Sequence, residues 1–89
     1  MEMIEVFKQY LEHVFAGKRC EAREVVMAAE DRGVGARSLV HGVIWPAMEQ
    51  IDKLYREGQI DRITEHMASR INRMLADQLQ GCMGRKPKN

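Results

Sequence analysis

Apolar side chains recur at three- and four-residue intervals in four separate stretches of the chain. This spacing places them along one side of an α-helix, so each stretch is predicted to form an amphipathic helix. The first covers about residues 2–16 and is followed by Gly17, a natural helix stop. Its apolar positions are Ile4, Val6, Phe7, Tyr10, Leu11, Val14 and Phe15.

The second stretch covers about residues 19–32 and carries mostly small apolar side chains, which allow a neighbouring helix to approach closely. Two glycines, Gly33 and Gly35, follow it and predict a break in the chain. Its apolar positions are Ala22, Val25, Val26 and Ala29.

The third stretch holds an apolar side for about four turns and is followed by Gly58. Pro46 lies inside it, lacks an amide proton, and presses its ring on the carbonyl of Gly42, so a kink or break is expected near that turn. Trp45 beside it is interpreted as a core or edge anchor. The apolar positions are Val40, Val43, Ile44, Ala47, Met48, Ile51, Leu54 and Tyr55.

The fourth stretch covers about residues 62–80, and Asp61 just before it can cap the free amides of its first turn. Its buried stripe is predicted to consist of Ile63, Met67, Ile71, Met74, Leu75 and Leu79. No stretch shows a strand-type alternation, and the links are short. The sequence therefore predicts an all-α, antiparallel four-helix bundle over residues 1–81, with the third helix kinked near Pro46, and a basic tail or linker over residues 82–89.

Length and charge restrict the function. A chain of 89 residues fits one domain, and its net charge of +1 argues against a nucleic-acid partner, although a basic segment follows Gly84. No stretch has the length of a transmembrane helix or the pattern of a secretion signal, so we expect a cytoplasmic protein without a membrane partner. Cys20 and Cys82 lie far apart and indicate neither a disulfide framework nor a zinc site.

Catalytic patterns are absent from the sequence: it contains no phosphate loop, no nucleophile elbow and no paired-histidine zinc helix. We therefore expect neither an enzyme nor a metal site made by the protein. Unusual polar residues gather between Tyr55 and His66, where Glu65 and His66 fall off the apolar stripe. A purely structural interpretation is also open, with Glu65 stabilising a helix start, His66 solvated, and Tyr55 packing with a wet hydroxyl.

Four short segments carry a family resemblance. The two most specific are Leu54-Tyr55-Arg56-Glu57-Gly58-Gln59-Ile60 and Glu65-His66-Met67-Ala68-Ser69, and the other two are Phe15-Ala16-Gly17-Lys18-Arg19 and Ile44-Trp45-Pro46-Ala47-Met48. They make the chain resemble the helical cap domain of methionine synthases, methanogenic corrinoid proteins and light-sensing regulators. In those proteins the cap precedes a Rossmann domain that binds cobalamin. The regulators have an aromatic residue followed, after nine others, by Glu-His, and here Tyr55 precedes Glu65-His66 at that spacing.

The resemblance implies cobalamin as cofactor, with an adenosyl or methyl group as its upper ligand. Tyr55 would cover that ligand, Glu65 and His66 would offer polar contacts, and Arg62 stands where an apolar ligand-facing residue is typical. These four residues are the predicted cofactor-binding set. Tyr55 replaces the usual tryptophan, Asp52 replaces a small residue, and Arg56 replaces a histidine that can bind cobalt in the light sensors; an arginine cannot coordinate the metal.

The family's cobalt-binding motif, Asp-x-His-x-x-Gly, is absent from these residues. The resemblance therefore implies a cap module that shields the upper ligand of a corrinoid held by a Rossmann domain, supplied by another chain or removed from this one. Binding by the cap alone is not expected to be tight, because it covers one face of a large cofactor. The alternative is a cofactor-free helical module for regulatory interaction or homodimerisation. The sequence leaves open which corrinoid and upper ligand are involved.

Overall fold

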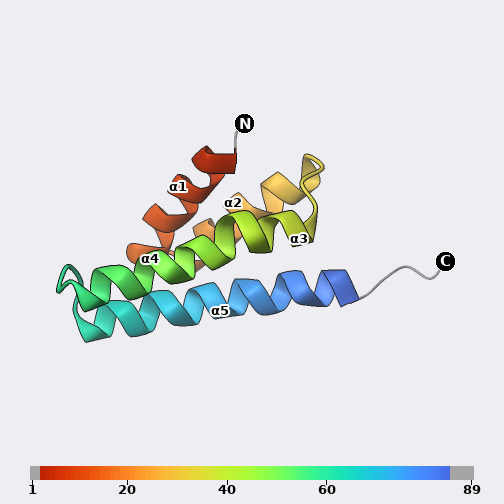
Figure 1. Cartoon of the computed structure of the whole chain (residues 1–89). Helices are drawn as coiled ribbons and strands as arrows, with labels where there is room; N and C mark the ends of the chain where they lie inside the picture. The colour runs from red at the N-terminus through yellow and green to blue at the C-terminus, as the bar shows by residue number, and fades with distance from the viewer. Residues whose placement is uncertain (1–2, 85–89) are drawn as a thin grey trace.

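The computed structural model describes residues 3–84, with side chains described through residue 81, and every regular element in this range is helical. The chain forms α1 (Met3–Phe15), α2 (Arg19–Asp31), α3 (Ala36–Leu39), a π-helical turn η1 (Val40–Ile44), α4 (Trp45–Arg56) and α5 (Arg62–Gly84). Figure 1 shows α1 and α2 lying across one side of a long antiparallel pair formed by α4 and α5. The all-α prediction is confirmed.

The predicted helix boundaries agree with the structure except in two places. The third helical stretch begins one turn earlier than predicted, because α3 leads without interruption through η1 into α4. The last helix continues to Gly84, beyond the predicted end near residue 80. The proposed domain boundary at residue 81 stays a prediction, since residues 85–89 of the predicted tail lie outside the described residues. Within the described range no helix is both long and apolar enough to cross a membrane.

The irregularity expected near Pro46 takes the form of the π-helical turn. The amide of Trp45 donates to the carbonyl of Val40, five residues earlier, immediately before the proline. Pro46 then occupies the first turn of α4, where its missing N–H is tolerated. Gly42 lies in this turn, and a Cβ atom there would approach the Met3 side chain of α1 to 3.2 Å. The turn is therefore also a point of close contact between α1 and the third helical stretch.

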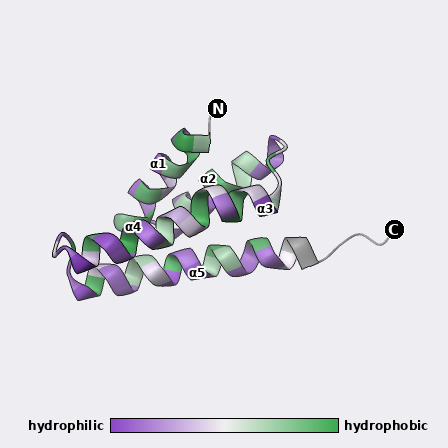
Figure 2. Ribbon diagram, viewed as in Figure 1, coloured by the Kyte–Doolittle hydropathy of each residue, from purple (hydrophilic) through white to green (hydrophobic). Residues whose placement is uncertain are grey.

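Each helix places one apolar side in a common core, and Figure 2 shows polar and apolar residues alternating along the ribbons as expected for amphipathic helices. Small side chains on α2, predicted to permit close packing, are fully buried against α1. The core residues are Val6, Tyr10, Val14, Ala22, Val26, Ala29, Leu39, Val40, Val43, Ile44, Ala47, Ile51, Ala68, Ile71, Leu75 and Leu79.

Some residues of the predicted apolar stripes are not buried. Ile63 is 79% exposed, so its assignment to the buried stripe of the last helix is wrong. Ile4, Met48 and Tyr55 are also exposed, and Trp45, at 50% exposure, lies at the edge of the bundle beside the ring of His41 rather than in the core. Periodicity finds the apolar side of a helix but not the part of that side that a neighbour covers.

One polar residue, Asn72 of α5, is buried within this core. Its side-chain oxygen accepts a hydrogen bond of 2.7 Å from the hydroxyl of Tyr10, and its amide nitrogen donates one of 3.1 Å to the carbonyl of Ile44. Burial raises the pKa of the Tyr10 phenol, which therefore stays protonated as the donor. The three residues join α1, η1 and α5 through their hydrogen bonds.

Replacing Tyr10 by Phe should lower the free energy of unfolding by about 1–3 kcal/mol, because the buried Asn72 oxygen loses its donor. Urea unfolding followed by circular dichroism measures the change. In a double-mutant cycle with Asn72→Leu, the two losses should be less than additive, since both variants remove the same hydrogen bond. Strict additivity would show that the Tyr10–Asn72 bond contributes nothing of its own.

Gly17 has a φ of +75° and closes the α1–α2 turn, where the amide of Lys18 donates to the carbonyl of His13 at 2.8 Å. Gly17→Ala should cost about 1–2 kcal/mol for the left-handed backbone alone. The added Cβ would also lie 2.9 Å from the Met67 sulfur, so this flexible side chain must move aside. Gly58→Ala is the matched control, with a similar φ of +77° and no atom within 4 Å of the new Cβ. The loss in unfolding free energy at Gly17 should be at least as large as at Gly58, and a smaller loss would contradict the prediction.

Candidate functional site

The predicted site lies where α4 turns back into α5. Gly58 reverses the chain here with a φ of +77°, its amide donating to the carbonyl of Tyr55 and the amide of Gln59 to that of Leu54, at 3.1 and 2.8 Å. This pair of bonds is the Schellman motif, which closes a helix end and needs a residue that accepts positive φ. The motif fixes the last turn of α4, from which Tyr55 projects.

The beginning of α5 is fixed by Asp61, as predicted. Its side-chain oxygen accepts a hydrogen bond of 2.8 Å from the amide of Thr64, and its carbonyl accepts one of 2.9 Å from the amide of Glu65. The Thr64 hydrogen bonds favour the charged carboxylate and hold the pKa of Asp61 below its usual value. Asp61 therefore fixes the turn that carries Glu65 and His66.

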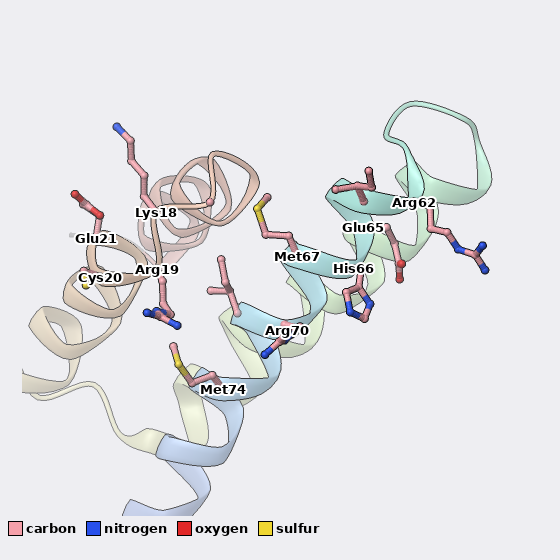
Figure 3. A pocket seen from close by; sticks show the side chains of 13 residues that line it. Lys18, Arg19, Cys20, Glu21, Arg62, Glu65, His66, Met67, Arg70 and Met74 are labelled. Carbon is pink, nitrogen blue, oxygen red and sulfur yellow. The ribbon is translucent and has the colours of Figure 1, made fainter.

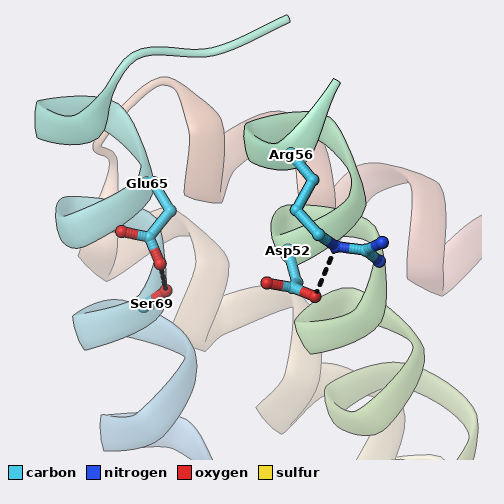
Figure 4. Close-up of polar contacts among 4 residues, drawn as sticks. All are labelled: Asp52, Arg56, Glu65 and Ser69. Atoms are coloured by element: carbon cyan, nitrogen blue, oxygen red, sulfur yellow. Dashed lines mark hydrogen bonds and ion pairs between the residues drawn. The ribbon is translucent and has the colours of Figure 1, made fainter. Parts of the chain in front are cut away.

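The four predicted residues come from both sides of this turn. Tyr55 is 38% exposed at the end of α4, Arg62 and His66 are exposed, and Glu65 is half-buried in the first turns of α5. Glu65 accepts a hydrogen bond of 3.3 Å from the hydroxyl of Ser69, one turn further along α5. Figure 4 shows this contact beside the neighbouring helix α4. The bundle's own packing leaves all four side chains at least partly open.

Two residues that depart from the family pattern contact each other. The Arg56 Nε atom lies 3.0 Å from an Asp52 carboxylate oxygen, with both side chains more than 60% exposed (Figure 4). Such an exposed pair contributes about 0–1 kcal/mol to stability. It places an ion pair on α4 beside Tyr55, at the two positions named above as departures from the pattern that the sequence resembles.

An open cleft of about 1310 Å³ separates α5 from the beginning of α2 (Figure 3). Arg62, Glu65 and His66 belong to its lining, but Tyr55 does not. In Figure 3 the Met67 and Met74 side chains point toward α2, whereas Arg62, Glu65 and His66 project from the other side of α5. Three of the four predicted residues thus lie along one margin of the cleft.

A smaller groove of about 430 Å³ runs between α4 and α5. His66 lines this groove as well as the cleft, so it lies on the ridge between them. The exposed Trp45 and Met48 lie in the groove and were not predicted as site residues. Their separation from Tyr55, by ten and seven residues, puts all three on one side of α4, and this spacing was the available signal. Among residues 3–81, no group of three or more His, Cys, Asp or Glu side chains could hold a metal ion.

Comparison with known proteins identifies the family. A sequence model described as the B12 binding domain matches residues 6–80, which run from the end of the first turn of α1 to the last turn of α5. The chain belongs to this family. It is the helical cap domain of cobalamin-binding proteins. Searches of curated proteins and of solved structures gave no significant match.

The family match covers both helices of the candidate site and the turn between them. It supports a cobalamin-related role for the cap domain as a whole.

The stability of the cap domain should depend on pH through Asp61. Because its pKa is lower in the folded than in the unfolded chain, the charged carboxylate stabilises the fold above its ordinary pKa of 3.8. This contribution is lost as the pH falls through the folded-state pKa. Asp61→Ala should therefore lower the melting temperature at pH 7, and the difference from wild type should shrink toward pH 2. A constant difference across this range would contradict the charge-dependent cap.

Proposed function

We propose that this cap domain covers the upper face of a corrinoid held by a Rossmann-type domain, with Tyr55, Arg62, Glu65 and His66 facing the upper axial ligand. The observation that carries the proposal is the α4–α5 turn. Gly58 and Asp61 fix the two helix ends there, and the bundle leaves the aromatic ring and the Glu-His pair accessible.

The side chains present suit one face of a corrinoid. A corrin is a flat, largely apolar ring with polar amide groups around its rim, so its protein surface needs both exposed apolar area and hydrogen-bonding groups. Tyr55 supplies partly exposed aromatic surface, and Trp45 and Met48 extend it along α4. Glu65 and His66 supply polar groups within one turn of α5. This combination fits the cofactor.

Each residue then has a distinct role. Tyr55 covers the ligand and limits the access of water. Its hydroxyl can donate and accept a hydrogen bond, whereas the indole N–H of the tryptophan usual in the family can only donate. Glu65 accepts hydrogen bonds through its carboxylate, with Ser69 holding one oxygen. Arg62 donates from the exposed beginning of α5, and His66 offers a donor or an acceptor. When bound, the cofactor supplies the reactive cobalt–carbon bond.

A partner domain completes the proposed site. The cap covers one face of the corrinoid in this arrangement. A corrinoid bound to the cap alone would keep its other face in water, so most of the cofactor's surface would stay unburied. A Rossmann-type domain supplies the second face in the proposed complex. The cap's contribution is binding and shielding of the ligand, not catalysis by its own residues.

Tyr55→Ala should weaken binding of methylcobalamin to the complex of the cap and a cobalamin-binding Rossmann domain by about tenfold, because a buried aromatic anchor is lost. Glu65→Gln should weaken it less, and Tyr55→Trp should preserve it. Titration calorimetry and the visible spectrum of the cobalamin measure these changes. Lys53→Ala is the matched control, since Lys53 is exposed on α4 and has no predicted role.

Two outcomes would contradict the proposal. The first is the absence of any change in cobalamin affinity or spectrum when wild-type cap is added to the Rossmann domain. The second is an equal effect of Tyr55→Ala and Lys53→Ala.

A cofactor-free dimer is the second candidate, and the exposed side of α4 favours it. Trp45 and Met48 are 50% and 55% exposed, and a second copy could cover them together with Tyr55. The same samples distinguish the two functions. A stable dimer without cobalamin, with a blue-shifted emission of Trp45, the single tryptophan, would support this candidate and leave the corrinoid no open surface at Tyr55.

A further inference from the structure

A second surface, separate from Tyr55, lies in the cleft between α2 and α5. Its floor includes Met67, Ile71 and Met74, which follow one another along α5 at spacings of four and three residues. Ile63 extends the line by one turn and is 79% exposed, whereas Met67 and Met74 are half-buried and Ile71 is buried at the base of the cleft. These four side chains form an apolar strip about 16 Å long at the ordinary rise of a helix. Within the bundle no helix covers the outer end of this strip.

Basic side chains border the strip. Lys18 and Arg19 at the beginning of α2 and Arg70 on α5 line the cleft. None of these three forms an ion pair within the part of the chain that the structure describes. Glu21 also lines the cleft, whereas Arg62 and Glu65 project from the other side of α5 (Figure 3). Positive charge therefore exceeds negative charge around an apolar floor.

We propose that this cleft binds an acidic amphipathic helix of a partner protein. An amphipathic helix lays apolar residues at helical spacing into a groove, and the apolar strip of α5 offers contacts at the same period. Acidic residues flanking the partner's apolar side would face Lys18, Arg19 and Arg70. The volume, about 1310 Å³, exceeds the usual range for a small-molecule pocket and suits the side chains of a helix. Two flexible methionines in the floor allow it to adapt to the partner's shape.

The basic side chains that border the cleft predict an acidic partner. A basic or neutral helix would bury part of these three cations without pairing them, which is costly. Opposite charges across the rim steer association and favour acidic partners over others. The binding surface does not depend on a corrinoid, because its floor on α5 and the Lys18 and Arg19 side chains at the beginning of α2 line the cleft, whereas Tyr55 on α4 does not. The proposal can therefore be tested without cobalamin.

The test uses a synthetic 15-residue peptide with leucines at three- and four-residue intervals and glutamates at the flanking positions, labelled for fluorescence anisotropy. We expect saturable binding to the full chain that weakens as salt is raised. Arg19→Glu and Ile63→Glu should each reduce the affinity by about tenfold or more, since each removes a contact and one reverses a charge. Lys53→Glu and Ile4→Glu are the matched controls outside the cleft and should leave it within about twofold.

A second readout locates the peptide. Cys20 is a free, exposed thiol that lines the cleft. In a Cys82→Ser protein, bound peptide should slow alkylation of Cys20 by iodoacetamide at least severalfold. Any one of four results would overturn the proposal. They are the absence of saturable binding, equal binding of a peptide with lysines in place of the glutamates, equal losses of affinity in the control variants, and alkylation of Cys20 that bound peptide does not slow. Unchanged peptide binding by Tyr55→Ala would separate this surface from the corrinoid site.

Discussion

The buried amide of Asn72 is the interaction on which the arrangement of the helices most depends. A polar side chain in an apolar core is tolerated only when its groups find partners, and here the partners come from two other segments, the Tyr10 hydroxyl of α1 and the Ile44 carbonyl of η1. Apolar packing alone would permit each helix to slide or rotate by a small step. The directional hydrogen bonds select one register of α5 against both neighbours. The side of α5 that carries Glu65 and His66 is set by this choice.

The third helical stretch takes part in the same hydrogen bonding through the Ile44 carbonyl, which accepts from the Asn72 amide. Ile44 ends the π-helical turn that precedes Pro46, so the residue bound by Asn72 also adjoins the irregular hydrogen bonding required by the proline. A π-helical turn adds a residue to one helical turn and therefore rotates everything that follows it about the axis. The direction in which Trp45, Met48 and Tyr55 project is a consequence of this local geometry. The hydrogen bonds of Asn72 and the π-helical turn, both in the core, therefore set the directions in which the exposed residues of α4 and α5 project.

Much of this could be predicted from the sequence, because it is local. The glycines at 17 and 58 end helices through a backbone conformation that few other residues accept, and Asp61 caps the next helix through its own side chain. The Tyr55 to Glu65-His66 spacing indicated the family, and the match over residues 6–80 confirmed it. The role of Asn72 could not be predicted, since its partners lie 62 and 28 residues away in the chain. The exposure of Ile63 has the same origin, because periodicity does not show where a neighbouring helix ends.

The first turns of α5 separate two surfaces that differ in chemistry. Tyr55 and the α4–α5 groove offer aromatic area next to a few polar groups, whereas the cleft toward α2 offers an apolar strip bordered by cations. His66 lines both the cleft and the groove, so a substitution at this position would affect contacts on both sides. Substitutions at Tyr55 and Arg19 act on one side each. An effect confined to one of those two residues therefore assigns a ligand to its surface, while an effect at His66 alone does not.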